Sequence, residues 1–458
     1  MQRPARFGLL AVAIAVIITV ALGARTALAD ELEIREHPTG DAVIPTYTWP
    51  GTPSDKFPQP GETITAETAD RVKGLVADGV LWCVRRGMTM DIVPYKPIPL
   101  PPNYQEATEK YSAQVKLLPD QTLEGYVAGR PFPQVDLNDP QAADKLMYNF
   151  ERGHYFTDDL GLNLFDADTG QLSKDSDGHQ HYDVERHFVL DWLRVLQYTG
   201  RLANDPKPDI PNNRDKTFRK AGLYPVIEPF DLKGIGGINY RYLDKGRMDD
   251  LWLYLPSLRR VRRLSSAQRS EALFGQDTDV DSYGGYSGQV PWFTWKFLGK
   301  KPMLASLHGE TLPPKPCKGD GGMTFCESYE KRPDVVIIEG TPKASQYAFS
   351  KRLIFMDTET FFIIYSDLYD RRGELWKTVI QNIRTDKKPN PAAGLEYPLP
   401  RMFIYGFTMV DMQMEHGTRV AIPGMAFQSE PGWYIDVGEK KGNSEDWYTI
   451  ASLVSAGH

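Results

Sequence analysis

Several common sequence patterns are absent from this chain, and each absence removes a class of function. Only three of the 458 residues are cysteine and no Cys-x-x-Cys pair occurs, which argues against a cysteine-based zinc or redox centre. The Gly-x-Ser-x-Gly and His-Glu-x-x-His motifs of common hydrolases are missing. Acidic residues outnumber basic ones, 60 against 53, which argues against general nucleic-acid binding. We therefore expect no metal, no cofactor and no nucleic acid.

Long apolar runs are missing after the N-terminus. Residues 7–24 form an uncharged stretch behind Arg3 and Arg6, and a small-residue site follows at 27–29. This arrangement is typical of a signal peptide cleaved before Asp30, and an uncleaved anchor is the alternative. Cleavage removes three of the 53 basic residues and changes the net charge from −7 to −10. The sequence thus predicts a signal peptide at 1–29 and a mature protein in the periplasm.

The few cysteines predict one bridge and one buried thiol. Cys317 and Cys326 enclose a short glycine-rich loop that a disulfide could close in an oxidising compartment. Cys83 lies in the apolar stretch 79–84, and we interpret it as a small buried hydrophobic residue.

The length and the turn residues favour a large β-rich protein. The chain has 35 prolines and 39 glycines, and it exceeds the usual size of a single core. A polar, proline-punctuated loop at 203–217 is the best internal boundary. We divide the mature chain into 30–215, an N-terminal arm with helices and first strands, and 216–458, an antiparallel meander that completes the same sheet.

Helices are expected mainly in the first part of the mature chain. Residues 65–78, 104–117 and 140–152 have helical patterns, and Gly79 is a stop signal for the first of them. Residues 186–198 allow either a helix or a strand, because both periodicities are present.

The segment 166–187 is the most polar part of the chain. It allows two functional interpretations, both of them metal sites, and one purely structural interpretation. On a strand, four of its side chains would share one face and could bind a metal: His179, His181, Asp183 and Glu185. Residues 173–184 also resemble part of a calcium loop, but the last position lacks the bidentate glutamate. A turn with an exposed strand edge is the simpler interpretation, and we adopt it.

The stretch 240–301 organises the rest of the chain. Residues 251–255 are all apolar or aromatic, which predicts a strand covered on both faces. A basic run follows at Arg259, Arg260, Arg262 and Arg263. We interpret it as a charged mouth that binds an anionic head group or docks a partner, and ion pairing with nearby aspartates is the alternative.

Short apolar segments separated by tight turns continue to the C-terminal region. They lie at 333–339, 351–356, 361–365, 375–381, 402–405, 407–415 and 418–422. This spacing predicts antiparallel strands with short connections.

Five stretches carry a resemblance to a known family. They are RMDDLWLYLPSLRRVRR at 247–263, SKRLIFMD at 350–357, YDRRGELWK at 369–377, GYVAGRPFP at 125–133 and WKFLGK at 295–300. The chain resembles Gram-negative envelope proteins described as outer-membrane-lipoprotein-sorting-like and related to the LolA and LolB carriers. The similarity spans nearly the whole mature chain, although this chain is much longer than LolA itself.

The resemblance implies a mainly β fold with α additions. One curved antiparallel sheet would form a half-open β-barrel, with helices over a concave face that holds an apolar ligand. The family is often encoded beside export pumps of the resistance–nodulation–division type. An inner-membrane exporter of that type and an outer-membrane protein are therefore the implied partners, beside a hydrophobic ligand or lipid.

The ligand-binding residues are expected in the apolar and aromatic strands: Trp252, Tyr254, Leu255, Trp295, Phe361, Ile363, Tyr365 and Trp376. Ordinary core packing is the alternative for any one of them. The predicted function is a periplasmic, non-catalytic carrier or scaffold for a lipid or other hydrophobic molecule. Two alternatives stay open: a periplasmic hydrolase that uses His179, His181 or His187 with Asp183, and a structural docking partner of an outer-membrane assembly.

Overall fold

The computed structural model describes residues 57–264, 269–390, 393–424, 432–439 and 443–457. The chain divides into two units, Met1–Ile44 and Pro45–His458, and every described residue belongs to the second. The predicted signal peptide at 1–29 lies outside the described residues. Within the described ranges, no helix combines the length and the apolar character that a membrane crossing requires.

Strands make up most of the regular structure. The α-helices are α2 (Asp78–Val84), α3 (Pro102–Tyr111), α4 (Ala142–Glu151) and α5 (Ile450–Ala456). The strands of the first half are β1 (Thr63–Ile64), β2 (Met90–Val93), β3 (Lys116–Leu117), β4 (Leu123–Glu124), β5 (Asp159–Lys174), β6 (Gln180–Gln197), β7 (Thr217–Leu223), β8 (Val226–Glu228), β9 (Gly236–Tyr242), β10 (Asp250–Leu255) and β11 (Arg260–Leu264). Those of the second half are β12 (Phe293–Ala305), β13 (Glu327–Pro342), β14 (Lys351–Asp357), β15 (Ile363–Tyr369), β16 (Leu375–Asp386), β17 (Arg401–Asp411), β18 (His416–Ala421) and β19 (Trp433–Ile435).

One large sheet of 17 strands contains all of these strands except β3 and β4. Antiparallel pairings give the order β11-β10-β9-β7-β6-β5-β18-β17-β16-β15-β14-β13-β12. Strand β2 adds to β13 in parallel, and β8 and β19 add to β6 and β5. The predicted mainly β fold with an antiparallel meander is therefore confirmed. Because β5 pairs with β18, segments from both sides of the boundary predicted near residue 215 share this sheet.

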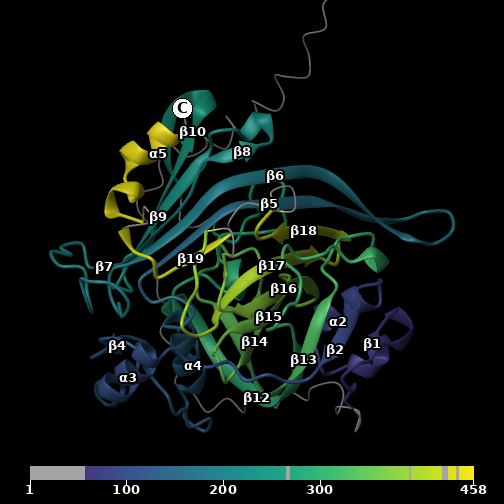
Figure 1. The fold of residues 1–458 in the computed structure, drawn as a ribbon, viewed down its shortest axis with the longest axis horizontal. Helices are drawn as coiled ribbons and strands as arrows, with labels where there is room; N and C mark the ends of the chain where they lie inside the picture. Colours follow the sequence, from purple (N-terminus) through teal and green to yellow (C-terminus); the bar gives the residue numbers. More distant parts are fainter. Residues whose placement is uncertain (1–56, 265–268, 391–392, 425–431, 440–442, 458) are drawn as a thin grey trace, which may run out of the picture. The chain divides into compact units, whose positions relative to one another are not determined.

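Both faces of the sheet are covered by apolar side chains. Val336 and Ile338 of β13 point into one hydrophobic cluster, and Val335 and Ile337 point into the other, as the two-residue repeat of a strand requires. Helix α4 packs into the first cluster and α2 into the second. Figure 1 shows the two helices on different sides of β13 and β14. The structure thus adds a helix on the face opposite to α4.

Helix α2 begins where the sequence predicted a helix to stop. The expected helix at 65–78 is a short 3-10 helix, Ala66–Val72, and Gly79 lies in the first turn of α2. A Cβ at Gly79 would lie 2.3 Å from Cβ of Thr378 in β16, so this position contacts the sheet too closely for any side chain. The helix expected at 140–152 corresponds to α4. The one expected at 104–117 was predicted too long: α3 ends at Tyr111, a 3-10 turn follows at Ser112–Gln114, and Lys116–Leu117 forms β3.

The polar segment 166–187 lies in the long hairpin of β5 and β6 (Figure 1). The side chain of Asp175 accepts hydrogen bonds from the backbone N–H groups of Asp177 and His179, which forms the turn. Residues 186–198, ambiguous in the sequence, continue β6 up to Gln197.

Candidate functional site

A cavity of about 310 Å³ lies on the face of the sheet that α4 covers. Its wall includes side chains of β5, β6, β7, β9, β17 and β19, and the segment 276–290 covers it. In the sheet, β9, β7, β6, β5, β18 and β17 are consecutive neighbours. Because side chains from all six strands line the same cavity, the sheet is concave on this face. The volume lies at the lower end of the range for ligand sites, roughly 300–1,000 Å³.

Alternate residues of the strands form this wall. In β7 these are Arg219, Ala221 and Leu223, and in β6 they include Leu193 and Val195. Leu160 and Leu162 of β5 continue the pattern. Side chains two apart share one face of a strand, so most of the wall is apolar, although it includes Arg219 and the strands themselves are of mixed composition.

The cover of the cavity is fixed by buried charged groups. Asp249 accepts hydrogen bonds from Arg241 (2.8 Å from Nη2) and Arg269 (3.1 Å from Nη1). Arg269 also donates to Asp281 of the cover (2.7 Å from Nε). Burial alone would raise the pKa of Asp249, but Arg241 and Arg269 outweigh it and lower the pKa to about 2. The carboxylate is therefore charged at neutral pH, and the cover is held by a complete ion-pair network.

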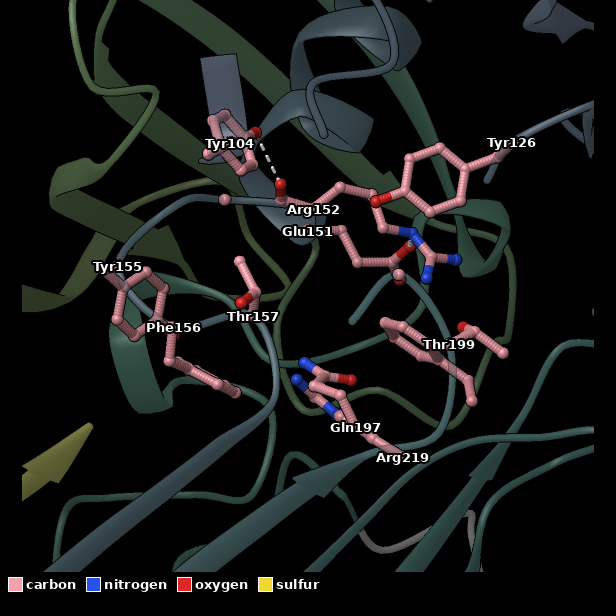
Figure 2. A pocket seen from close by; sticks show the side chains of 13 residues that line it. Tyr104, Tyr126, Glu151, Arg152, Tyr155, Phe156, Thr157, Gln197, Thr199 and Arg219 are labelled. Atoms are coloured by element: carbon pink, nitrogen blue, oxygen red, sulfur yellow. Dashed lines mark hydrogen bonds and ion pairs between the residues drawn. The ribbon is translucent and has the colours of Figure 1, made fainter. Parts of the chain in front are cut away.

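A small polar pocket of about 30 Å³ adjoins the apolar cavity (Figure 2). The two share Glu151, Tyr155, Phe156 and Arg219. A further cavity of about 410 Å³ shares Glu151 with both of them. An apolar space with a polar pocket at one end is the arrangement that an amphiphilic molecule fits.

None of the eight residues predicted to bind the ligand lines this cavity. Five of them pack in or against the core on the same face: Leu255, Trp295, Phe361, Ile363 and Trp376. Trp252 and Tyr254 belong to a separate cluster with Leu453 of α5, and Tyr365 lies on the opposite face of the sheet. The structure therefore does not bring these eight side chains together at this cavity.

The predicted arginine run lies at an edge of the sheet. Strand β11 pairs with β10 alone within the described ranges, and all four arginines are exposed. Arg263 forms an ion pair with Asp250, as the alternative interpretation expected for such groups. None of the four lines the apolar cavity or its polar pocket.

The three cysteines and the histidines His179, His181 and His187 do not line the cavity. Cys317 and Cys326 are joined by a disulfide, and Cys83 is buried in α2, where burial raises the pKa of its thiol well above the usual value. Among the described residues, one group of possible metal ligands has its atoms within 4.8 Å of one another: Asp175, Asp177 and His179, all exposed at the hairpin turn. His187 contacts Asp168 at 2.6 Å.

The sequence-based prediction placed the ligand on the fully apolar strands, whereas the cavity is lined by strands of mixed composition. A strand that is apolar at every position packs against protein on both faces. The useful signal was alternation, as in Arg219, Ala221 and Leu223, where every second residue faces the cavity.

The comparison with known families settles where the chain belongs. Residues 63–453 match the family described as a protein of unknown function, DUF1329. The chain belongs to the DUF1329 family. This membership confirms the family predicted from the sequence. A curated relative, the uncharacterized protein PA3922 of Pseudomonas aeruginosa, is 24% identical over 340 residues, which are 70% of this chain and 68% of that protein.

Solved structures similar to this DUF1329 chain have low sequence identity to it. A domain from Vibrio parahaemolyticus, named provisionally for outer membrane lipoprotein sorting, is 16% identical with a TM-score of 0.44, over 69% of this chain and 100% of its own. A DUF1329 protein from Desulfovibrio piger is 15% identical with a TM-score of 0.43 over the same shares. The LolA superfamily protein NE2245 from Nitrosomonas europaea is 14% identical with a TM-score of 0.35, over 67% of this chain and 98% of its own.

Proposed function

We propose that this DUF1329 protein is a non-catalytic carrier or scaffold that binds a lipid or other hydrophobic molecule in the cavity of about 310 Å³. The observation that carries this proposal is the apolar wall contributed by alternate residues of the concave sheet. Each methylene group moved from water into such a wall contributes roughly 0.8 kcal/mol, so an alkyl chain alone supplies the binding energy.

The periplasm is the proposed location of this activity. The support is the charged N-terminus, the uncharged stretch 7–24 and the small residues at 27–29, which together have the form of a cleaved signal peptide. The resemblance to envelope carriers adds an export system as the proposed setting, with a resistance–nodulation–division-type exporter and an outer-membrane protein as partners.

The exposed arginines of β11 are the proposed contact for such a partner. Arg259, Arg260 and Arg262 form no ion pair with any described residue. They lie in or next to β11, whose other edge pairs with no strand in the described part of the chain. Exposed guanidinium groups bind carboxylates and phosphates through paired hydrogen bonds. An acidic surface on the partner fits this edge.

The hydrolase alternative has less support. His179 and His181 are exposed at the end of a hairpin, and neither they nor His187 lines a described cavity. A catalytic base must lie within hydrogen-bond reach of a bound substrate, and none of the three cavities described above contains these histidines.

The first test fills the cavity. Ala221 lies in its wall, and an Ala221→Phe substitution places an aromatic ring where the ligand would lie. We expect binding of a fluorescent fatty acid, measured by titration, to weaken by about tenfold or more, since several methylene contacts are lost. Thermal unfolding of the variant checks that the protein is folded.

The matched control is Ala113→Phe, at an exposed position outside the cavity. It should bind the fluorescent fatty acid as the wild type does. Equal binding by wild type and Ala221→Phe would show that the ligand lies elsewhere, and no binding by the wild type would contradict the carrier proposal.

A further inference from the structure

One charged side chain in the wall of the apolar cavity has no ion-pair or hydrogen-bond partner among the described residues. Four charged residues line this cavity: Glu151, Arg219, Arg241 and Arg269. Asp249 and Asp281 neutralise Arg241 and Arg269. Glu151 pairs with the neighbouring Arg152, at 3.4 Å between Oε2 and Nε.

Arg219 differs from these three. It forms no ion pair and no hydrogen bond through its side chain with any described residue, and its Nε is buried. It lies in β7, between β6 and β9, and it is half-buried. Burial and the nearby Arg241 lower the pKa of the Arg219 guanidinium to about 10, so it is still a cation at neutral pH.

The charge balance around Arg219 favours an anion. Arg152 and Arg219 contribute two positive charges to this end of the cavity, and Glu151 contributes one negative charge. Arg241, Arg269, Asp249 and Asp281 cancel one another. A desolvated cation without a counter-ion is unfavourable, and an anionic ligand that pairs with it removes the penalty.

The polar pocket has further groups that a head group could satisfy. Figure 2 shows the ends of Gln197 and Arg219 next to each other, across the pocket from Tyr104 and Tyr126. Oε1 of Gln197 and Oγ1 of Thr199 are buried without a hydrogen-bond partner among the described residues. Buried polar atoms are usually satisfied, so unsatisfied ones from two residues beside an unpaired cation indicate a polar ligand group.

We propose that Arg219 binds the anionic head group of an amphiphile whose alkyl chain lies in the apolar cavity. This inference rests on the proposed carrier function and specifies the ligand class: one alkyl chain with a carboxylate or a phosphate. The planar guanidinium donates paired hydrogen bonds to either group. The head group lies in the pocket of about 30 Å³, and the chain lies along Ala221 and Leu223.

The test compares ligands that share a chain and differ in charge. Dodecanoate, dodecyl phosphate and dodecan-1-ol are titrated into the delipidated full-length mature protein at fixed ionic strength. We expect the wild type to bind one or both anions about 10- to 100-fold more tightly than the alcohol, the usual difference for a hydrogen bond to a charged group. The ratio between the two anions identifies carboxylate or phosphate as the preferred group.

Substitutions assign the preference to Arg219. Arg219→Met, with Arg219→Gln as a second neutral variant, should bind the alcohol as the wild type does and lose the preference for anions. Arg219→Lys should keep part of it, because the charge stays and the paired geometry is lost. The control Arg214→Met, at an exposed position that lines none of the three cavities, should keep the full preference.

Two outcomes overturn this inference, and a third concerns the carrier function itself. Equal binding of dodecanoate, dodecyl phosphate and dodecan-1-ol by the wild type shows that no charge is recognised. An anion preference that survives in the neutral variants of Arg219 assigns it to another group. If the wild type binds none of the three compounds, the proposed carrier function fails together with the inference that rests on it.

Discussion

Asp249 is the residue on which the closed side of the cavity depends. It is fully enclosed and accepts hydrogen bonds from Arg241, Arg269 and Gln289. The two arginines line the cavity, so the carboxylate connects β9, the segment beginning at residue 269 and the cover. Buried ion pairs of this kind are expensive to break, because the remaining partners stay buried and charged.

We expect Asp249→Asn to lower the free energy of unfolding by about 3–5 kcal/mol, since two buried guanidinium groups then share one fewer counter-charge. Denaturant titration at pH 7 measures the change. Asp231→Asn is the control, because Asp231 pairs with Arg186 on the surface with 64% of its side chain exposed. That pair should contribute about 0–1 kcal/mol, so equal effects of the two substitutions would contradict the role given to Asp249.

The side chains that line the cavity were harder to predict from the sequence than the helices and strands. Tyr365 and Ile363 were chosen because their strand is apolar throughout, yet they lie on opposite faces of the sheet and neither lines the cavity. Arg219 carries no motif. Its importance comes from what surrounds it in space, which includes Glu151 and Arg241 from distant parts of the chain.

At the scale of elements, a buried carboxyl group of the sheet contacts the first turn of α2. Asp367 of β15 is fully buried and accepts hydrogen bonds from Oγ1 of Thr378 (2.7 Å) and the backbone N–H of Gly79 (3.3 Å). Burial raises the pKa of Asp367 to about 7. The folded protein therefore holds a proton that the unfolded chain releases above its ordinary pKa of about 3.9.

This linkage predicts a pH dependence of stability. A raised carboxyl pKa contributes stability below about pH 3.9, and that contribution is lost as the pH rises towards about 7. From this group alone, the free energy of unfolding should fall by about 1.4 kcal/mol per pH unit near pH 5, and by about half of that near pH 7, where the folded carboxyl is half ionised. Asp367→Asn should remove this slope, as unfolding titrations at pH 5, 6, 7 and 8 would show.

Comparing the wild type with Asp367→Asn isolates the contribution of the Asp367 carboxyl group, since both proteins have all other titrating residues in common. Parallel stability profiles for wild type and Asp367→Asn would contradict the raised pKa. Asp231→Asn serves again as the exposed control and should leave the slope unchanged.

The spacing of apolar and turn residues predicted most helices and strands, because these elements depend largely on residues close together in the sequence. Helix α4 and strands β13, β14, β16 and β18 overlap the expected segments. The segments expected at 402–405 and 407–415 form one strand, β17, and the strand expected at 361–365 is β15, which begins only at Ile363. The first helix was misplaced, because Gly79 is a stop signal locally but lies in α2 owing to its close contact with Thr378. For residues 186–198, pairing with β5 and β7 decided between strand and helix.

At the scale of the whole described unit, the order of strands is the feature that creates the site. Strand β5 pairs with β18 across about half the chain, and this pairing brings β6, β7 and β9 round to face β17. A pairing between such distant segments leaves no trace in local periodicity. The resemblance to envelope carriers did predict a curved sheet, and the sequence alone did not indicate which strands would enclose the cavity.

The most direct test of the carrier account is native mass spectrometry, with organic extraction, of the protein purified from its own periplasm without detergent. The account predicts a bound molecule at one copy per chain that extraction identifies as an amphiphile with an alkyl chain. It also predicts that Ala221→Phe, prepared in the same way, lacks this mass. A wild-type protein that carries no ligand, and takes up no fluorescent fatty acid afterwards, would contradict it.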